Sequence, residues 1–134
     1  LYNNMGIERD DKEGRLRAIV RKFEFFDAPY IAFLGMNLAF GTTVALDVGM
    51  YAQSLMLTMV AFGLHSCPMG TMRNYTDMVR EAFDVQDESK ILFGLSFGYE
   101  DTAVAANKTR TEREPVSASV MFRSQAKNDS ATQE

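Results

Sequence analysis

The sequence predicts an α+β fold that combines helices with at least two strands. A long apolar run between Leu46 and Gly63 has the length and residue spacing of a helix, and an amphipathic pattern at residues 9–26 predicts another helix. Two further stretches, residues 30–36 and 90–99, have the short apolar or alternating pattern that is typical of strands. The chain has 134 residues, of which 46% are hydrophobic and 24% charged, and this composition fits one globular domain.

The predicted N-terminal helix, residues 9–26, carries its apolar residues on one side and most of its charged residues on the other. Asp10 or Asp11 is placed to cap its first turn, because an aspartate side chain accepts hydrogen bonds from the free amides there. Pro29 ends the helical pattern, and the next stretch, residues 30–36, is short and continuously apolar. Such a run is typical of a central strand.

The long helix is predicted to follow a loop at residues 37–43 and to end at Gly63. Apolar side chains lie on nearly every side of it, so we expect it to be buried. Three small residues spaced about one turn apart would let another backbone or a flat ligand lie close, namely Ala45, Gly49 and Ala52. Gln53 is a polar residue inside this helix, and we expect its amide to find a backbone or subunit partner.

A membrane span is the alternative interpretation of this helix, because only Gln53, Ser54 and Thr58 are clearly polar between residues 48 and 64. A span usually needs about 20 apolar residues. Here Asp47 stands at one end and His65 at the other, so the apolar stretch is shorter than that. We therefore favour a core helix and predict no membrane insertion.

A Cys-Pro-Met-Gly-Thr turn is predicted after the long helix, at residues 67–71. Pro68 removes one amide donor, whereas Gly70 would let the backbone approach a ligand without a side chain in the way. Asn74 is placed to cap a short helix after the turn. The predicted buried face of that helix comprises Tyr75, Met78, Val79, Ala82 and Phe83.

Residues 90–99 alternate between bulky and small side chains, which predicts a strand with one bulky face and one nearly bare face. The bulky set is Ile91, Phe93, Leu95, Phe97 and Tyr99, and the other set is Leu92, Gly94, Ser96 and Gly98. A helix or a planar group could approach the bare face closely.

The C-terminal region is polar and irregular at residues 100–114, where Lys108, Arg110 and Arg113 form a basic cluster. Such a cluster is commonly solvated surface, but two nearby arginines can also hold a phosphate, and their spacing leaves both alternatives open. Residues 116–122 alternate as a short strand would, and residues 123–134 have the composition of a disordered tail.

Charge and cysteine content argue against several classes of protein. The net charge of -4 and the pI of about 5.0 disfavour a nucleic-acid-binding surface. A single cysteine, Cys67, allows no internal disulfide, and with the single histidine, His65, it leaves no conventional zinc cluster, so we predict no metal site. Cys67 is interpreted as a small buried residue rather than a redox thiol, and His65 as a charge partner at the helix end or a surface residue. No secretory leader pattern is present, so we expect a cytoplasmic protein.

Five segments resemble, in order and spacing, the C-terminal part of the FMN-dependent nitroreductase family. They are GIERDDKEGRLRAIVRKFEFFDAP, YIAFLGM, LDVGMYAQSLMLTMVAFGLHSCPMG, KILFGLSFGYED and ANKTRTEREPVSASVMF. The resemblance covers residues 6–122 and implies a central, mostly antiparallel sheet flanked by helices, with the long helix buried. It also implies a homodimer in which residues 116–122 cross to the other subunit and extend its sheet. Residues 1–122 would then form a partial nitroreductase-like domain and residues 123–134 a disordered tail.

The resemblance implies an FMN-dependent NAD(P)H oxidoreductase that passes hydride from NAD(P)H through flavin N5 to a nitroaromatic, a quinone or a similar small-molecule acceptor. The flavin performs the chemistry, so we nominate no catalytic side chain. In the family, the turn after the long helix meets the N5 and O4 edge of the flavin. This turn falls here on Pro68, Met69, Gly70 and Thr71.

The FMN phosphate is the second part of the implied site. The tail motif of the family carries an arginine that binds this phosphate, which matches Arg113, with Arg110 as a neighbouring candidate. Thr111 stands where many members have a lysine. Tyr51 and Phe40 are candidates either for lying over the flavin or for the core.

The resemblance further implies that a typical member has an N-terminal part before the region that corresponds to this chain, which starts at Leu1. That part carries an Arg-Arg-Ser-type motif and a later Asn, which hold the FMN phosphate, the ribityl chain and the pyrimidine ring. The alternative to an FMN enzyme is therefore a truncated, non-catalytic nitroreductase-like domain that acts only in subunit association.

Overall fold

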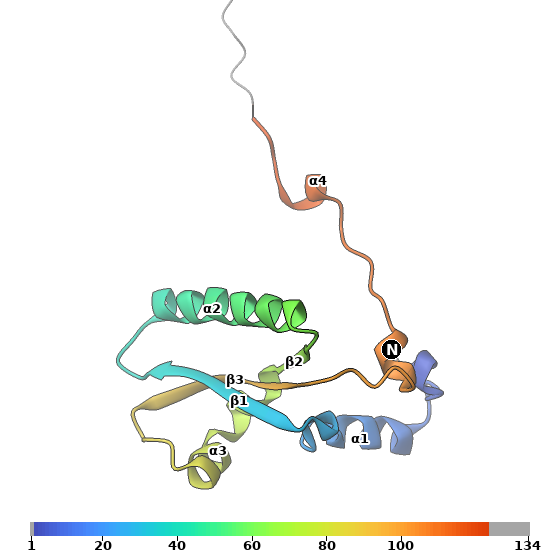
Figure 1. Ribbon diagram of the computed structural model, residues 1–134, viewed down its shortest axis with the longest axis horizontal. Helices are drawn as coiled ribbons and strands as arrows, with labels where there is room; N and C mark the ends of the chain where they lie inside the picture. The colour runs from blue at the N-terminus through green and yellow to red at the C-terminus, as the bar shows by residue number, and fades with distance from the viewer. Residues whose placement is uncertain (1, 124–134) are drawn as a thin grey trace, which may run out of the picture.

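A three-stranded antiparallel sheet forms the centre of the computed structural model, which describes residues 2–123 (Figure 1). Its strands are β1 (Tyr30–Asn37), β2 (His65–Met69) and β3 (Ser89–Gly98). Both β1 and β2 pair antiparallel with β3, which lies between them. The predicted combination of helices with a mostly antiparallel sheet is confirmed.

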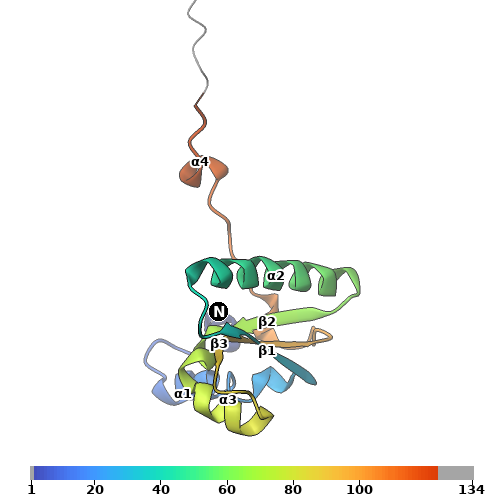
Figure 2. The same ribbon diagram turned by 90° about the vertical axis from the view of Figure 1, so that its left-hand side faces the viewer.

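Helices cover both faces of this sheet (Figures 1 and 2). Helix α2 (Thr42–Ala61) lies along one face, and α1 (Lys12–Val20) and α3 (Thr76–Phe83) lie on the other side. Because both faces are covered, an apolar side chain on either face of a strand can be shielded from water. This explains the continuous apolar run at residues 30–36, which belongs to β1.

The strand register places β1 at an edge of the described sheet, so the prediction that it is the central strand is wrong. Tyr30 lies opposite Phe97, and their rings stack with centroids 5.5 Å apart. A bulge at the other end of the pair leaves Leu92 without a partner on β1, because Leu34 lies opposite Phe93 and the next residue opposite Ile91. The strict alternation predicted for residues 90–99 therefore holds only beyond this bulge.

The main hydrophobic core lies between α2 and the sheet. Leu95 of β3 is fully buried, and Leu34 of β1 packs with it. Helix α2 contributes Ala52 and Met59, which are also buried. Burial of a leucine side chain contributes about 1.5 to 3 kcal/mol, so this contact is a principal reason why α2 is attached to the sheet.

The outer side of α2 is exposed. Four of its apolar side chains, Leu46, Met50, Leu57 and Val60, remain 61–64% accessible to solvent. The prediction that this helix is buried on nearly every side is therefore wrong for the described residues, because a single sheet face covers only one side of a helix. By length and composition alone, with a mean hydropathy of 1.4, α2 could cross a membrane, a test that core helices of soluble proteins also pass.

The opposite face of β3 is bare as predicted, and side chains of the same chain fill it. A Cβ added at Gly94 would lie 3.1 Å from Met72 Cγ and 3.2 Å from Met69 Cε, and one at Gly98 would lie 2.7 Å from Pro29 Cδ. Phe33, which pairs with Gly94, contacts aromatic rings of the helical layer at centroid distances of 5.0 and 6.5 Å. The absence of side chains on β3 thus allows close packing of these neighbours.

Helix α1 is shorter than the predicted helix at residues 9–26. Asp11 caps it by accepting a hydrogen bond from the Gly14 amide at 2.8 Å, as one of the two predicted caps. Three consecutive residues after it have positive φ angles of 52° to 58°, namely Phe25, Phe26 and Asp27. This left-handed backbone cannot continue an α-helix, so the helical pattern in the sequence extends beyond the helix itself.

Two predicted boundaries around α2 and α3 are also wrong. Helix α2 begins at Thr42, inside the predicted loop at residues 37–43. Its other end agrees with the predicted stop, because Gly63 follows the C-cap Phe62 with a φ of +74°. Asn74 does not cap α3, because it lies within a 3-10 helix, Gly70–Tyr75, that leads directly into α3. An N-cap residue needs a non-helical backbone, which Asn74 therefore lacks. On the predicted buried face of α3, only Val79 is fully buried.

The C-terminal arm, residues 109–123, leaves the body of the chain (Figure 1). Its predicted strand is not formed here: Val116–Ser119 is a single helical turn, α4, and Val120 to Phe122 are exposed. A strand needs a neighbouring strand for its amides, and no described residue supplies one. The prediction of a disordered tail concerns residues 123–134, of which all but Arg123 lie outside the described residues.

Candidate functional site

Strand β2 positions the candidate ligand-facing backbone. Residues 67–69, predicted as part of a turn, belong to this strand, which pairs Cys67 with Ser96, Pro68 with Leu95 and Met69 with Gly94. Met69 is buried with 4% of its surface accessible, so its side chain anchors the end of the strand. The chain then enters the 3-10 helix at Gly70. The candidate residues are therefore held by the sheet rather than by a free turn.

The amides of Gly70 and Thr71 are the first two of that 3-10 helix, where N–H groups have no partner within the helix itself. Among residues 2–123, no turn or loop hydrogen bond of the backbone involves either amide, and the backbone-to-side-chain bonds start at other residues. Gly70 is exposed, and a Cβ added to it would meet nothing within 4 Å. Gly70 thus places an unbonded amide beside open space, and the half-buried Thr71 adds a second unbonded amide directly after it. Neighbouring backbone donors of this kind suit the edge of a planar, oxygen-bearing ligand.

Pro68 and Met69 contribute to this site in different ways. Pro68 is exposed and has no amide hydrogen, so only its ring and its carbonyl can touch a ligand. Met69 contributes backbone only, since its side chain is buried against Gly94. Of the four predicted turn residues, Gly70 and Thr71 therefore carry the available donors.

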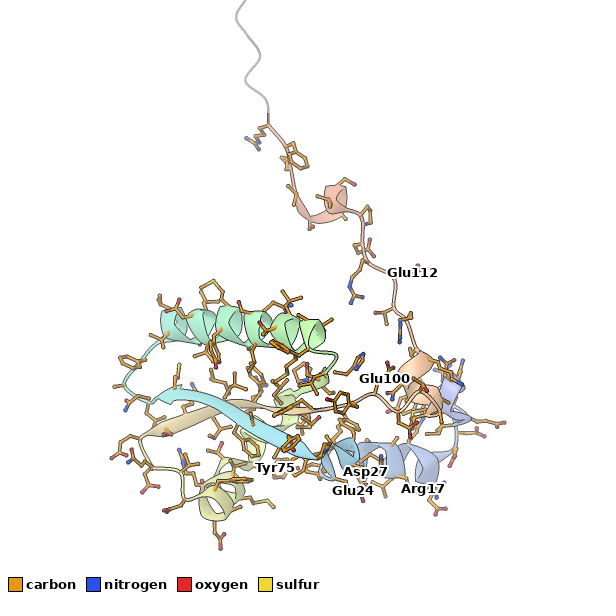
Figure 3. All side chains as sticks on the ribbon, viewed as in Figure 1. Arg17, Glu24, Asp27, Tyr75, Glu100 and Glu112 are labelled. Atoms are coloured by element: carbon orange, nitrogen blue, oxygen red, sulfur yellow. The ribbon has the colours of Figure 1, made fainter. Side chains whose placement is uncertain are left out.

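Arg110 and Arg113 lie on the C-terminal arm. Figure 3 shows Glu112, which stands between them, on the part of the arm that extends away from the sheet. Both guanidinium groups are exposed and donate to their own segment: Arg110 Nη1 to the Asn107 carbonyl at 2.5 Å, and Arg113 Nη1 to Thr111 Oγ1 at 2.6 Å. The structure does not bring these arginines together with Gly70 within one chain. Both remain free to exchange these contacts for a phosphate.

Cys67 is exposed, so its interpretation as a small buried residue is wrong. The reason is its place on β2, an edge strand with less cover than β3. Neighbouring atoms still desolvate the thiol enough to raise its pKa, and the positive charge of Lys22 opposes this shift. A thiol with a raised pKa is a weak nucleophile at neutral pH.

His65 is a surface residue at the start of β2, one of its two predicted roles. Its Nε2 lies 3.4 Å from an Oε2 oxygen of Glu100, just past the end of β3 (Figure 3). The His65 side chain is exposed and that of Glu100 is half-buried, so solvent still screens the pair and it contributes at most about 1 kcal/mol. His65 therefore joins β2 to the segment after β3 without lying beside Gly70.

Sequence reasoning missed an open groove of about 410 Å³ between α2 and the end of β1. Its lining is mostly apolar, with one carboxylate and one tyrosine hydroxyl, and comprises Phe33, Leu34, Gly35, Asp47, Val48 and Tyr51. The groove lies at the β1 edge, whereas Gly70 follows β2 at the other edge. Tyr51 and Phe40, predicted either for the flavin or for the core, are 63% and 54% accessible, so neither belongs to the core. Over the described residues no three His, Cys, Asp or Glu side chains gather closely enough to hold a metal ion.

Comparison with known proteins gives a consistent result. The profile of the Nitroreductase family matches residues 6–99. A nitroreductase named NfnB from Mycolicibacterium smegmatis is 37% identical over 122 residues, which are 91% of this chain and 52% of that protein. A 4-nitrobenzoate reductase from Pseudomonas putida is 31% identical over 113 residues, which are 84% of this chain and 50% of that protein.

Solved structures share the fold described above. The crystal structure of the FMN-dependent nitroreductase NfnB from Mycobacterium smegmatis in complex with NADPH has a TM-score of 0.87 at 36% identity, over 92% of this chain and 55% of that chain. The FMN- and NADPH-dependent nitroreductase NfnB from Sphigopyxis sp. strain HMH has a TM-score of 0.88 at 31% identity, with the same coverage of 92% and 55%. The chain thus spans about half the length of the relatives that it matches.

Proposed function

Because the chain belongs to the nitroreductase family, we propose that it supplies a flavin-binding surface to an FMN-dependent oxidoreductase that uses NAD(P)H. The observation that carries this proposal is the pair of amides at Gly70 and Thr71, which have no backbone partner among residues 2–123 and follow one another beside the open space at Gly70. When bound, FMN supplies hydride transfer between a nicotinamide and a nitroaromatic, quinone or similar acceptor. The names of the relatives, which include nitroreductases and a 4-nitrobenzoate reductase, support a nitroaromatic acceptor.

In this proposal each part of the site has a separate task. The amides of Gly70 and Thr71 donate to the oxygen- and nitrogen-bearing edge of the flavin, and the sheet keeps them in place because Met69 is anchored on β3. Donors that are fixed before the ligand arrives lose little conformational entropy when it binds. Arg113, with Arg110 beside it, supplies positive charge to the FMN phosphate. No side chain of this chain is required as a general acid or base.

Subunit association is the second part of the proposal. The exposed apolar side chains of α2 and of the C-terminal arm support a homodimer, since monomeric soluble proteins rarely leave such surfaces uncovered. If the arm reaches a second copy of the chain, it brings Arg113 to the sheet and helices of the partner subunit. We also propose a cytoplasmic location, which suits the exposed thiol of Cys67.

FMN titration tests the proposal. The purified chain should quench flavin fluorescence on binding FMN, and the bound flavin should bleach anaerobically on addition of NADPH and recover its colour on addition of a nitrobenzoate. A matched sample of the Gly70→Ala variant controls for flavin held elsewhere.

If the chain is folded and dimeric yet leaves flavin fluorescence unchanged, the function is that of the alternative, a non-catalytic domain acting in subunit association. The observation that favours this alternative is the course of the arm, which carries Glu112, the residue beside Arg113, away from the sheet of its own chain (Figure 3).

A further inference from the structure

The C-terminal arm starts from a short segment that is tied to the body of the chain at both ends. This segment, residues 100–108, follows β3, and we refer to it as the arm base. At its start, an Oε2 oxygen of Glu100 lies 3.4 Å from Nε2 of His65. Just after its end, Oγ1 of Thr109 accepts a hydrogen bond at 3.0 Å from Nδ2 of Asn4, which lies near the other end of the sequence. The first residue of the arm is therefore bonded to the N-terminal part of the chain.

The arm base is compact because its polar groups bond to one another. The Asp101 carbonyl accepts a hydrogen bond from Nδ2 of Asn107 at 2.9 Å. A 3-10 helix, Ala105–Lys108, closes the segment, and the Thr109 amide donates back to the Ala106 carbonyl at 3.1 Å. Thr109 is thus held from both sides, by the arm base through its backbone and by Asn4 through its hydroxyl.

Asn4 is itself fixed to the rest of the chain. It lies in the 3-10 helix Asn3–Met5, which contacts the 3-10 helix of the arm base, and Figure 1 shows the N-terminal end of the chain beside this segment. The guanidinium carbon of Arg15 lies 5.2 Å from the centre of the Tyr2 ring, a cation–π contact that joins this N-terminal turn to α1. The hydrogen bond from Asn4 therefore ties the arm to a turn that α1 holds in place.

Beyond Thr109 the arm has no comparable tie among residues 2–123. Its hydrogen bonds there stay within residues 107–120, including those of Arg110 and Arg113 to nearby carbonyl and hydroxyl oxygens. Figure 3 shows Glu112 on the part of the arm that extends away from the sheet. The direction in which the arm leaves the body, and with it the position of Arg113, is therefore set at Thr109.

We propose that Asn4 is a positioning residue for Arg113, because its hydrogen bond to Thr109 fixes the direction of the arm. The inference rests on the proposed function, in which Arg113 supplies positive charge to the FMN phosphate. An arm that already points in one direction loses less conformational entropy on binding than an arm that swings about its base. Loss of the bond between Asn4 and Thr109 should therefore weaken FMN binding, although neither side chain is placed at the flavin.

Tryptic cleavage tests the tie and requires no flavin. Cleavage after Lys108 needs an opened arm base, whereas cleavage after Arg113 takes place where the arm is already free of the body. Asn4→Ala should raise the rate after Lys108 several-fold relative to the rate after Arg113. Thr109→Val, which removes the hydroxyl and keeps the shape of the side chain, should do the same. The double variant should cleave no faster than either single variant, because each change removes the same bond. Thr109→Ser keeps the hydroxyl and is the matched control, which should cleave like the unaltered chain.

FMN titration of the same variants tests the positioning. Asn4→Ala should raise the dissociation constant for FMN several-fold and leave that for riboflavin, which lacks the phosphate, unchanged, whereas a merely destabilised fold would weaken both. Thr109→Ser should bind FMN normally. The inference is overturned if Asn4→Ala cleaves like the unaltered chain, or if it cleaves faster and still binds FMN equally well. If the unaltered chain binds no FMN, the proposed function fails and the role at the phosphate fails with it, while the cleavage rates still decide whether Asn4 holds the arm.

Discussion

Met69 and Gly94 lie opposite each other on β2 and β3, and the Met69 side chain occupies the space that a side chain at position 94 would need. The strand end before Gly70 is therefore fixed to the middle of the central strand. Because the candidate amides follow Met69 directly, their direction depends on this contact. Gly94, which is not itself part of the proposed flavin site, thus determines how the flavin-facing backbone is placed.

Gly94→Val should weaken both the fold and flavin binding. Its methyl groups would displace Met69 and Met72, which lie 3.2 and 3.1 Å from the position of a Cβ, and such overpacking costs about 1 to 3 kcal/mol. Urea unfolding measures the stability, and FMN titration of the folded fraction measures the affinity. Gly35→Ala is the matched control: its Cβ would lie 2.6 Å from the Lys90 carbonyl oxygen, so it should lower stability but leave FMN affinity unchanged. Equal loss of affinity in both variants would contradict a specific role for the contact between Met69 and Gly94.

Gly70→Ala should lower FMN affinity while leaving the stability of the fold nearly unchanged. The added methyl meets nothing within 4 Å and φ there is not positive, so the free energy of unfolding should change by less than about 0.5 kcal/mol. FMN affinity should fall, because the methyl group occupies the space through which the flavin edge approaches the amides. Gly41→Ala, which also meets no atom within 4 Å, is the control and should bind FMN normally. Unchanged affinity in Gly70→Ala would remove the basis for placing the flavin at this backbone.

Arg113→Ala should reduce FMN affinity about tenfold or more, since a charge-assisted hydrogen bond to phosphate contributes about 1.5 to 3 kcal/mol. Riboflavin, which lacks the phosphate, should bind the variant and the unaltered chain equally, and this comparison assigns the loss to the phosphate. Arg17→Ala is the control, because Arg17 is an exposed arginine paired with Glu13 at 2.8 Å on α1, away from the arm. An Arg113→Ala variant with normal FMN affinity would transfer the assignment to Arg110.

The regular elements could be predicted because their patterns are local. A strand can be identified from its own residues, as the alternation at residues 90–99 and the apolar run at residues 30–36 show. Both predicted strands are present, as β3 and β1 respectively. The helical pattern at residues 9–26 extended beyond α1 because the left-handed backbone at Phe25 to Asp27 leaves no periodicity signal. The position of β1 at an edge was not predictable either, since an apolar run shows that both faces are covered but not which strand lies in the middle.

The candidate site could be predicted only in part, for a related reason. Gly70 was identified from its lack of a side chain, and the structure leaves open space beside it. That Cys67 to Met69 form a strand rather than a turn depends on pairing with β3, which lies more than twenty residues further along the chain. The exposure of Cys67 and of the outer side of α2 likewise depends on what lies beside them in space. Short sequence patterns contain no such information.

Cys67 should have a pKa above that of an ordinary thiol, and it should therefore react slowly with alkylating reagents at neutral pH. Desolvation raises the pKa of this thiol, and Lys22 lowers it by a smaller amount, so the neutral form persists to higher pH in the folded chain than in the unfolded one. The rate of iodoacetamide alkylation, followed from pH 7 to 10.5, should therefore reach its midpoint at higher pH in the native chain than in urea. Replacement of the positive charge in Lys22→Met should move the native midpoint further upward. Because the unfolded thiol ionises first, this group makes folding less favourable as the pH rises above the ordinary thiol pKa. If the alkylation midpoint of the native chain lay below the midpoint in urea, the positive charge of Lys22 would outweigh desolvation. The pKa of Cys67 would then be lowered, and Cys67 would be a reactive thiol.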